Sequence, residues 1–181
     1  MNREKALALL RNHLQNKNLV KHCFAVEACM RAMAVRLGFD PEPWGEAGLV
    51  HDLDYEMTGM SADLHTKETV KILEGLGVDP AIIHAVQAHA GKAPCASPMD
   101  TAIFAVDPLT GLIVAATLMH PTKKIRNIDA EFVKRRYKEK SFAKGARRED
   151  IETCRNLGLE LDEFISVCLA AMQGIEAELG L

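Results

Sequence analysis

Residues 47–56 read AGLVHDLDYE. An apolar helical segment, which we expect to begin near Pro43, ends here in the adjacent pair His51 and Asp52. An imidazole nitrogen and a carboxylate at one helix end can bind the same cation. Two ligands are too few for tight binding, so the sequence predicts further ligands on neighbouring helices.

Three more side chains fit that expectation. His22 lies on the apolar face of a helix predicted over about 19–37, and His89 lies on the apolar face of a helix predicted over about 79–89. Asp107 interrupts the most hydrophobic part of the chain. Burying a polar or charged group is costly unless it is paired or binds a metal. A lone core histidine is usually structural, but several such residues on separate helices of one bundle indicate a shared site.

The ordered set His22, His51-Asp52 and Asp107 resembles the HD-domain superfamily, metal-dependent phosphohydrolases built on a helical bundle. The resemblance covers roughly residues 18–120, which we take as the metal-binding core. It implies that these four residues hold a divalent cation. It also implies an all-α, compact, HD-like helical bundle forming one domain over residues 1–181.

Some branches of that superfamily bind two metals through two more histidines between the doublet and the late aspartate. His65 and His89 lie in that interval. The resemblance then implies that Asp52 bridges two cations, with His22, His51 and Asp107 completing one site and His65 and His89 the other. The alternative for His65 is a solvent-facing residue at a helix start.

Two departures from the superfamily pattern matter. Leu53 to Glu56 stand where the signalling phosphodiesterase branch has Ile-Gly, which argues against a cyclic dinucleotide substrate. Pro108 follows Asp107, and proline disfavours a helical conformation in the residue before it. Asp107 could therefore be the N-cap of a helix instead of a ligand.

The implied cofactor is one or two divalent transition-metal ions. Histidine and carboxylate ligands suit Fe, Mn, Co, Ni or Zn without choosing among them. Such an ion lowers the pKa of a bound water, and the resulting hydroxide can attack phosphorus. We expect Asp52, Lys123 and Lys124 to carry the chemistry, the lysines by offsetting charge on the phosphoryl oxygens. A turn over 141–145 is a weaker phosphate-binding candidate, and Asp54 and Glu56 could orient a ligand or act as general acids.

The composition favours helices independently of the resemblance. Ala, Leu and Met together number 52 of the 181 residues, against 21 for Val and Ile, and no alternating strand pattern is evident. Further helices are predicted over about 3–15, 64–76, 100–119 and 161–179.

Charge is unevenly distributed. Residues 121–148 hold 11 of the 22 Lys and Arg with three acids, a net +8, whereas the remainder carries −11. This basic C-terminal segment suggests an anionic substrate, or is simply a solvated helix face. With few aromatic residues beside the charges, nucleic acid is an unlikely partner.

Several expectations concern the protein's setting. Five cysteines without a CxxC pair suggest free thiols in a reducing cytoplasm. No secretory signal is visible, the uncharged run 109–119 is too short to span a bilayer, and we expect no membrane partner. An all-helical domain of this kind could form a homodimer.

The function predicted is hydrolysis of a small phosphorylated molecule, such as a nucleotide, by metal-activated water. One alternative is a non-catalytic metal- or ligand-binding module. Another is a di-iron oxygenase on the same fold.

Overall fold

A computed structural model describes residues 1–59 and 61–181. The described residues form helices and turns and contain no strand, which confirms the predicted all-α class. The first six helices are α1 (Arg3–His13), α2 (Lys17–Leu37), α3 (Pro41–Val50), α4 (Lys67–Gly75), α5 (Pro80–His89) and α6 (Pro98–Met119). The remaining elements are η1 (Ile125–Asn127), α7 (Ala130–Lys138), α8 (Arg148–Ile151), η2 (Glu152–Leu157), α9 (Leu161–Gln173) and α10 (Glu176–Leu179).

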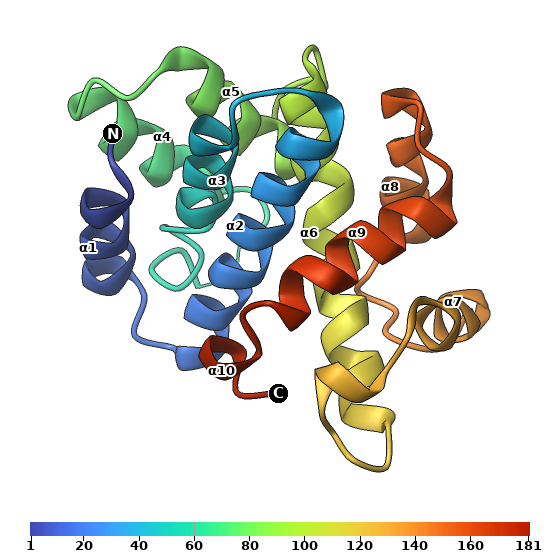
Figure 1. The fold of residues 1–181 in the computed structure, drawn as a ribbon. Coiled ribbons are helices and arrows are strands. Elements are labelled where there is room, and N and C mark those ends of the chain that lie inside the picture. The colour runs from blue at the N-terminus through green and yellow to red at the C-terminus, as the bar shows by residue number, and fades with distance from the viewer. Residues whose placement is uncertain (60) are drawn as a thin grey trace.

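The long apolar helix α6 runs through the middle of the molecule (Figure 1). It packs against α2 and α5 on one side and against α7, α8 and η2 on the other. By length and hydropathy alone α6 could cross a membrane, yet here it is a core helix. Its fully buried side chains are Ala102, Ile103, Ala105, Val106, Leu109, Thr110, Leu112, Ile113, Ala116 and Thr117.

Helix α6 continues through Pro108 without a break. It begins instead with a capping box, in which the Ser97 hydroxyl accepts from the Asp100 amide and the Asp100 carboxylate accepts from the Ser97 amide. Asp107 therefore lies within the helix and does not cap it. Proline has no backbone N–H to donate to the Phe104 carbonyl, so α6 lacks one internal hydrogen bond at this point.

Helices α2 and α3 approach each other very closely at Gly48. A Cβ atom added to Gly48 would lie 2.9 Å from both the Cα and the amide nitrogen of Glu27 in α2. Only glycine fits between the two backbones. This contact sets the distance between α2, which carries His22, and the end of α3, which carries His51.

The C-terminal third of the chain consists of several short helices. The basic segment 121–148 contains η1 and α7, and the predicted helix over 161–179 is two helices, α9 and α10, separated at Gly174. Helix α9 packs back against α2 as well as α7, and it crosses in front of α6 in Figure 1.

Candidate metal centre

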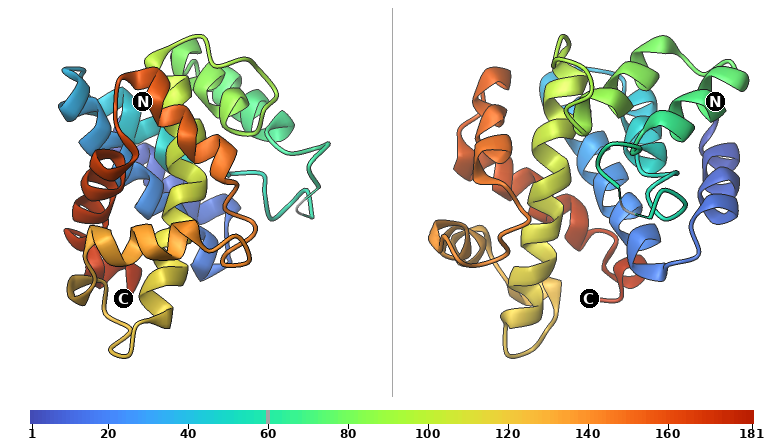
Figure 2. Two further views of the ribbon diagram at one scale, coloured as in Figure 1. Left: turned by 90° about the vertical axis from the view of Figure 1, so that its right-hand side faces the viewer. Right: turned by 180° about the vertical axis from the view of Figure 1, so that it is seen from behind.

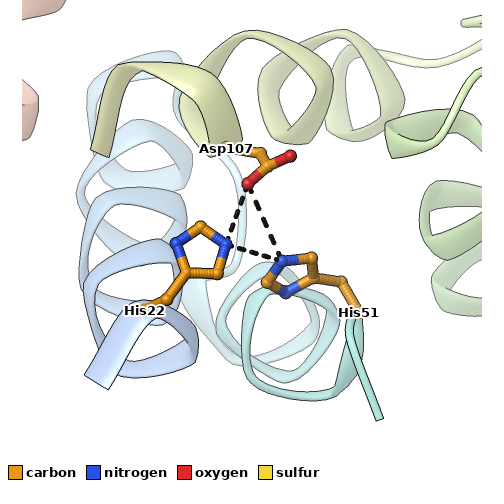
Figure 3. Close-up of side chains that lie close together, drawn as sticks. All are labelled: His22, His51 and Asp107. Atoms are coloured by element: carbon orange, nitrogen blue, oxygen red, sulfur yellow. Dashed lines mark hydrogen bonds and ion pairs between the residues drawn. The ribbon is translucent and has the colours of Figure 1, made fainter. Parts of the chain in front are cut away.

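Six histidine and aspartate side chains from five parts of the chain meet beside α6. Three of them, His22 from α2, His51 from the end of α3 and Asp107 from α6, point at one another in Figure 3. The His22 Nε2 atom lies 2.9 Å from Asp107 Oδ1 and 3.2 Å from His51 Nε2. These three residues place one ligand atom each close enough to share an ion.

The second group lies next to the first and shares Asp52 with it. His65, in the turn before α4, and His89, the last residue of α5, place their Nε2 atoms 2.9 Å apart. Asp52 Oδ1 lies 3.2 Å from His65 Nε2 and 3.4 Å from His89 Nε2. Its other oxygen, Oδ2, lies 3.5 Å from His51 Nε2 and 3.8 Å from His22 Nε2. Asp52 therefore presents one oxygen to each pair of histidines.

Two of the histidines are oriented by the helix ends on which they sit. His51 Nδ1 lies 2.8 Å from the Gly48 carbonyl, and His89 Nδ1 contacts the Val86 carbonyl, in each case three residues earlier. The last carbonyls of a helix lack an intrahelical donor, so an imidazole N–H is a natural partner. A carbonyl oxygen only accepts, so each Nδ1 carries the proton. Each Nε2 is left with a lone pair facing the cluster.

The same logic applies to the other two histidines. The Thr110 hydroxyl donates to the Asp107 carbonyl, so it accepts from His22 Nδ1 at 3.3 Å. His65 Nδ1 lies 2.9 Å from Asp54 Oδ1 and donates to it. All four histidines thus turn Nε2 toward Asp52 and Asp107, and in a neutral ring this nitrogen carries the lone pair. Lone pairs and carboxylates gathered this way repel one another unless a cation or a proton lies between them.

This donor set fits a pair of divalent transition-metal ions. Imidazole and carboxylate ligands are those that Fe, Mn, Co, Ni and Zn share, and hydrogen bonds from the outer imidazole nitrogens fix each ring in its ligating orientation. His22, His51 and Asp107 would hold one ion and His65 and His89 the other, with one Asp52 oxygen for each. No Lys or Arg forms an ion pair with Asp52 or Asp107 among the described residues.

Without metal, the pKa values in this cluster are displaced in opposite directions. Burial lowers the pKa of His51 to about 4, so that ring is neutral at neutral pH. Burial also disfavours charge on His65, but its hydrogen bonds to Asp52 and Asp54 dominate and raise its pKa to about 9. Burial opposes ionisation of Asp52 and Asp107, yet the surrounding histidines hold the pKa of both carboxyls below the usual range. A proton on His65 thus occupies part of the space that a cation would take.

Asp54 orients His65 and also starts the next helix. Its fully buried carboxylate accepts from the backbone amides of Thr66, Glu68 and Thr69 at 3.1 Å each, in addition to His65. Burial raises the pKa of Asp54, but these hydrogen bonds outweigh it and lower the pKa overall. The expectation that Asp54 could orient a ligand describes this geometry. Glu56 instead accepts from the amides of residues 15 and 16, away from the centre. Thr110 was missed, because nothing in sequence marks a threonine three residues after Asp107.

The structure does not bring Lys123 and Lys124 to the centre. Helix α6 runs twelve residues beyond Asp107, about 18 Å, and both lysines lie exposed past its far end. The neighbourhood of the cluster is instead formed by a later part of the basic segment. A cavity of about 430 Å³ touches His22, His89 and Asp107 and is lined on its other side by Ala143, Gly145, Ala146 and Asp150.

A second opening leads to the cluster from the side of the 51–65 turns. This cavity of about 360 Å³ is lined by Asp52, Tyr55 and His65 together with Leu19 and Ala90. It also reaches His22, His89 and Asp107, so the two cavities meet at the metal centre. A solvent-derived nucleophile and a substrate could therefore reach the same atoms from different sides.

Fold and site together define an all-helical protein with a histidine–aspartate cluster that could hold metal. The model of the HD domain family matches residues 19–153, and the chain belongs to this family of metal-dependent phosphohydrolases. The matched region contains all six residues of the cluster and also Asp150.

The curated relatives are longer proteins. "Ribonuclease Y 2" of Levilactobacillus brevis is 32% identical over 99 residues, which are 52% of this chain and 18% of the relative. "Ribonuclease Y" of Sulfurovum sp. is 26% identical over 136 residues, 74% of this chain and 27% of the relative. "Ribonuclease Y" of Bacillus thuringiensis (strain Al Hakam) is 29% identical over 140 residues, 74% and 26%. The chain thus spans about a quarter or less of these relatives' length. No solved structure matches it.

Proposed function

We propose that this protein hydrolyses a phosphate ester of a small phosphorylated molecule, such as a nucleotide. The observation that carries the proposal is the division of the Asp52 carboxylate between two pairs of histidine Nε2 atoms. That arrangement is suited to two ions a short distance apart, and two-metal sites stabilise both the attacking and the leaving oxygen of an in-line displacement at phosphorus.

The residues have distinct roles in this proposal. Bound ions supply a water of lowered pKa and hence hydroxide near neutral pH. The four histidines and Asp107 would bind the ions, and Asp52 would offer one carboxylate oxygen on the side of each pair of histidines. Asp54 and Thr110 hold the rings of His65 and His22 in the orientation that leaves each Nε2 free.

The proposed size of the substrate follows from the cavities. Volumes of about 430 and 360 Å³ lie within the range of sites for small molecules. In the sequence, Lys144 and Arg147 lie next to residues that line the cavity of about 430 Å³, and both side chains are exposed. Cations beside such a cavity favour an anionic substrate.

Metal content and phosphate release test the proposal together. Protein purified without chelators should contain about two transition-metal ions per chain, and with added Mn²⁺ it should release phosphate from members of a nucleotide and sugar-phosphate panel. Asp52→Ala should lose both properties, because one carboxylate serves both half-sites. His13→Ala, which alters a histidine outside the cluster, is the matched control and should change neither.

The other outcomes separate the remaining functions. Phosphate release by Asp52→Ala at the wild-type rate would overturn the proposal. Oxygen consumption without phosphate release would identify a di-iron oxygenase. A bound metal whose removal lowers stability, in a protein that turns over no member of the panel, would indicate a non-catalytic module.

RNA is a second candidate substrate, favoured by one observation. The relatives are named as ribonucleases. Cleavage of a single-stranded oligoribonucleotide with Mn²⁺, without phosphate release from mononucleotides, would select this candidate over the first.

A further inference from the structure

The cavity of about 430 Å³ beside the metal centre has two walls of different character. One wall contains His22 and His89 with the α6 face that carries Phe104, Asp107, Pro108 and Gly111, residues spaced to share one side of a helix. The other wall is the segment from Ala143 to Asp150, which returns along α6 after α7 (Figure 2). A substrate in this cavity lies between the two.

Arg148 fixes the shape of the second wall. Its guanidinium donates to five backbone carbonyls, those of Tyr137, Glu139, Phe142, Ala143 and Ala146, at 2.6 to 3.4 Å. Ala143 adopts a left-handed conformation with φ of 45°. This conformation is costly for a residue other than glycine and is held by the surrounding bonds. The wall is thus a fixed structure built around the half-buried guanidinium of Arg148.

Among the residues that line this wall, Asp150 is the one with an ionisable side chain. The others are Ala143, Gly145 and Ala146, which leave the cavity open in front of it. The Asp150 side chain is 18% exposed, and its Oδ2 atom lies 3.4 Å from the Nε atom of Arg147, which is itself exposed. Asp107 of the metal centre lines the same cavity.

We propose that Asp150 is the general acid of the reaction, donating a proton to the leaving-group oxygen of a phosphate ester whose phosphorus faces the metal centre across the cavity. The inference rests on the proposed hydrolysis and adds a catalytic residue to it. A bare carboxylate on the substrate side of a phosphate site would repel the substrate, whereas a protonated one donates a hydrogen bond to it.

Protons and bonds balance in this step. The oxygen of water bonds to phosphorus, and the bond from phosphorus to the leaving oxygen breaks with its electron pair. The leaving oxygen takes the Asp150 proton and departs as an alcohol. The proton that water loses to solvent restores the acid form of Asp150 through the open cavity, so the net reaction consumes one water.

The electrostatics of Asp150 support this assignment. Burial raises its pKa, and although Arg147 lowers the pKa, the negative charges of Glu149 and Asp107 raise it further, so the net pKa lies above the ordinary value. Catalytic acids are shifted in this direction by burial and by nearby negative charge.

Leaving-group dependence separates a general acid from a structural residue. The experiment measures kcat of the Mn²⁺-loaded protein on p-nitrophenyl phosphate, whose leaving group departs as an anion, and on phenyl phosphate and an alkyl phosphate, whose leaving groups need a proton. Asp150→Asn should leave p-nitrophenyl phosphate turnover nearly unchanged and reduce alkyl phosphate turnover about 10²–10⁴-fold. Asp150→Glu should recover part of the loss.

Controls make each outcome decisive. Glu131→Gln removes an exposed charge of α7 that does not line the cavity, and it should alter the turnover of none of the three esters. Metal content and the melting temperature of Asp150→Asn should match the wild type. An equal fall on all three esters, or no fall on the alkyl ester, would overturn the role of Asp150 while leaving the proposed hydrolysis standing. Absence of turnover by the wild type of these esters and of every member of the nucleotide and sugar-phosphate panel would overturn both.

Discussion

At the scale of single residues, the metal centre depends on which nitrogen of each histidine carries the proton. Gly48, Val86, Thr110 and Asp54 each supply an acceptor to one Nδ1 atom. Removing such an acceptor frees the ring to rotate or change tautomer, even though the ligand itself is intact. Substitutions of these outer partners typically reduce metal affinity about 10–100-fold.

The protonation of His65 predicts how the metal-free protein responds to pH. Its pKa is raised from 6.5 to about 9 in the fold, so its contribution to stability is present below pH 6.5 and is lost as pH rises through about 9. Metal affinity should change in the opposite sense and strengthen over the same interval, because the competing proton leaves. Thermal unfolding of chelated protein and metal titrations between pH 6.5 and 9.5 measure the two trends.

His65→Gln isolates this effect from other titrating groups. In that variant both pH dependences should become flatter between pH 6.5 and 9.5. Chelated wild-type protein that grows more stable across this interval, relative to the variant, would contradict the predicted charge state of His65.

At the scale of elements, helix ends and close contacts place the ligands. Helices α3 and α5 each stop at a histidine, α6 carries Asp107 at its middle, and α2 is pressed against α3 at Gly48. His22, His89 and Asp107 lie on helices, so a small shift of one of these helices moves its ligand out of reach without unfolding the protein.

Gly48→Ala should separate α2 from α3. The added Cβ would meet the Glu27 backbone at 2.9 Å, and backbone atoms cannot move aside as a flexible side chain does. Overpacking of this kind costs about 1–3 kcal/mol. We expect a lower free energy of unfolding in denaturant titrations together with weakened metal binding. Gly111→Ala, at a position with open space around its Cβ, should have a much smaller effect on stability.

Arg148→Ala should loosen the wall formed by 143–150. Five carbonyls would lose a charged donor, and the left-handed conformation at Ala143 would lose its support. We expect faster amide hydrogen exchange over residues 139–147 with metal content unchanged, and a raised KM for any phosphate ester that the protein turns over. Arg135→Ala, at an exposed arginine of α7, serves as the comparison. Unaltered exchange in Arg148→Ala would show that the segment holds its shape by other means.

The sequence was informative about elements that carry their own signals. The helices predicted over about 19–37 and 79–89 agree with α2 and α5, because Gly38 and Asp79 cap these helices through local chemistry. It was less informative where tertiary packing decides. Pro108 is a helix-breaking signal that burial of α6 overrides, and α7 arises in a basic segment whose periodicity is weak in isolation.

The residues of the site also divide into those with a local sequence signal and those placed by tertiary packing. Histidines and aspartates that face apolar helix sides were predictable as a group, and the structure gathers His22, His51, Asp52, His65, His89 and Asp107 in one place. Nearness in sequence misled for Lys123 and Lys124, because α6 carries them away from Asp107. Asp150 lies 43 residues beyond Asp107 and reaches the cavity only through the path of α7 and α8, which no local pattern reveals.

At the scale of the whole molecule, the centre joins segments that lie far apart in the sequence. Its ligands come from α2, α3, α5, α6 and the turns after α3. A bound ion therefore restrains several helices at once, and its free energy of binding adds to the stability of the fold. The cytoplasmic location and the homodimer stay predictions at this scale.

Removal of metal should lower the melting temperature substantially. At a free metal concentration one hundred times the dissociation constant, one ion stabilises the fold by about 2.7 kcal/mol. For a chain of this size that corresponds to about 5–10 °C in melting temperature. Differential scanning calorimetry before and after dialysis against EDTA measures the shift, and readdition of metal should reverse it. Identical melting curves for metal-loaded and chelated protein would contradict the claim that metal binding stabilises the fold.

The two histidines that end α3 and α5 have an electrostatic consequence beyond ligation. Both helices finish at the centre, so each directs the negative end of its dipole, roughly half an elementary charge, toward the ions. This field favours the more positively charged oxidation state of a bound metal ion. An iron ion held here would accordingly be oxidised to the trivalent state at a lower potential than the same histidine and aspartate ligands would set elsewhere.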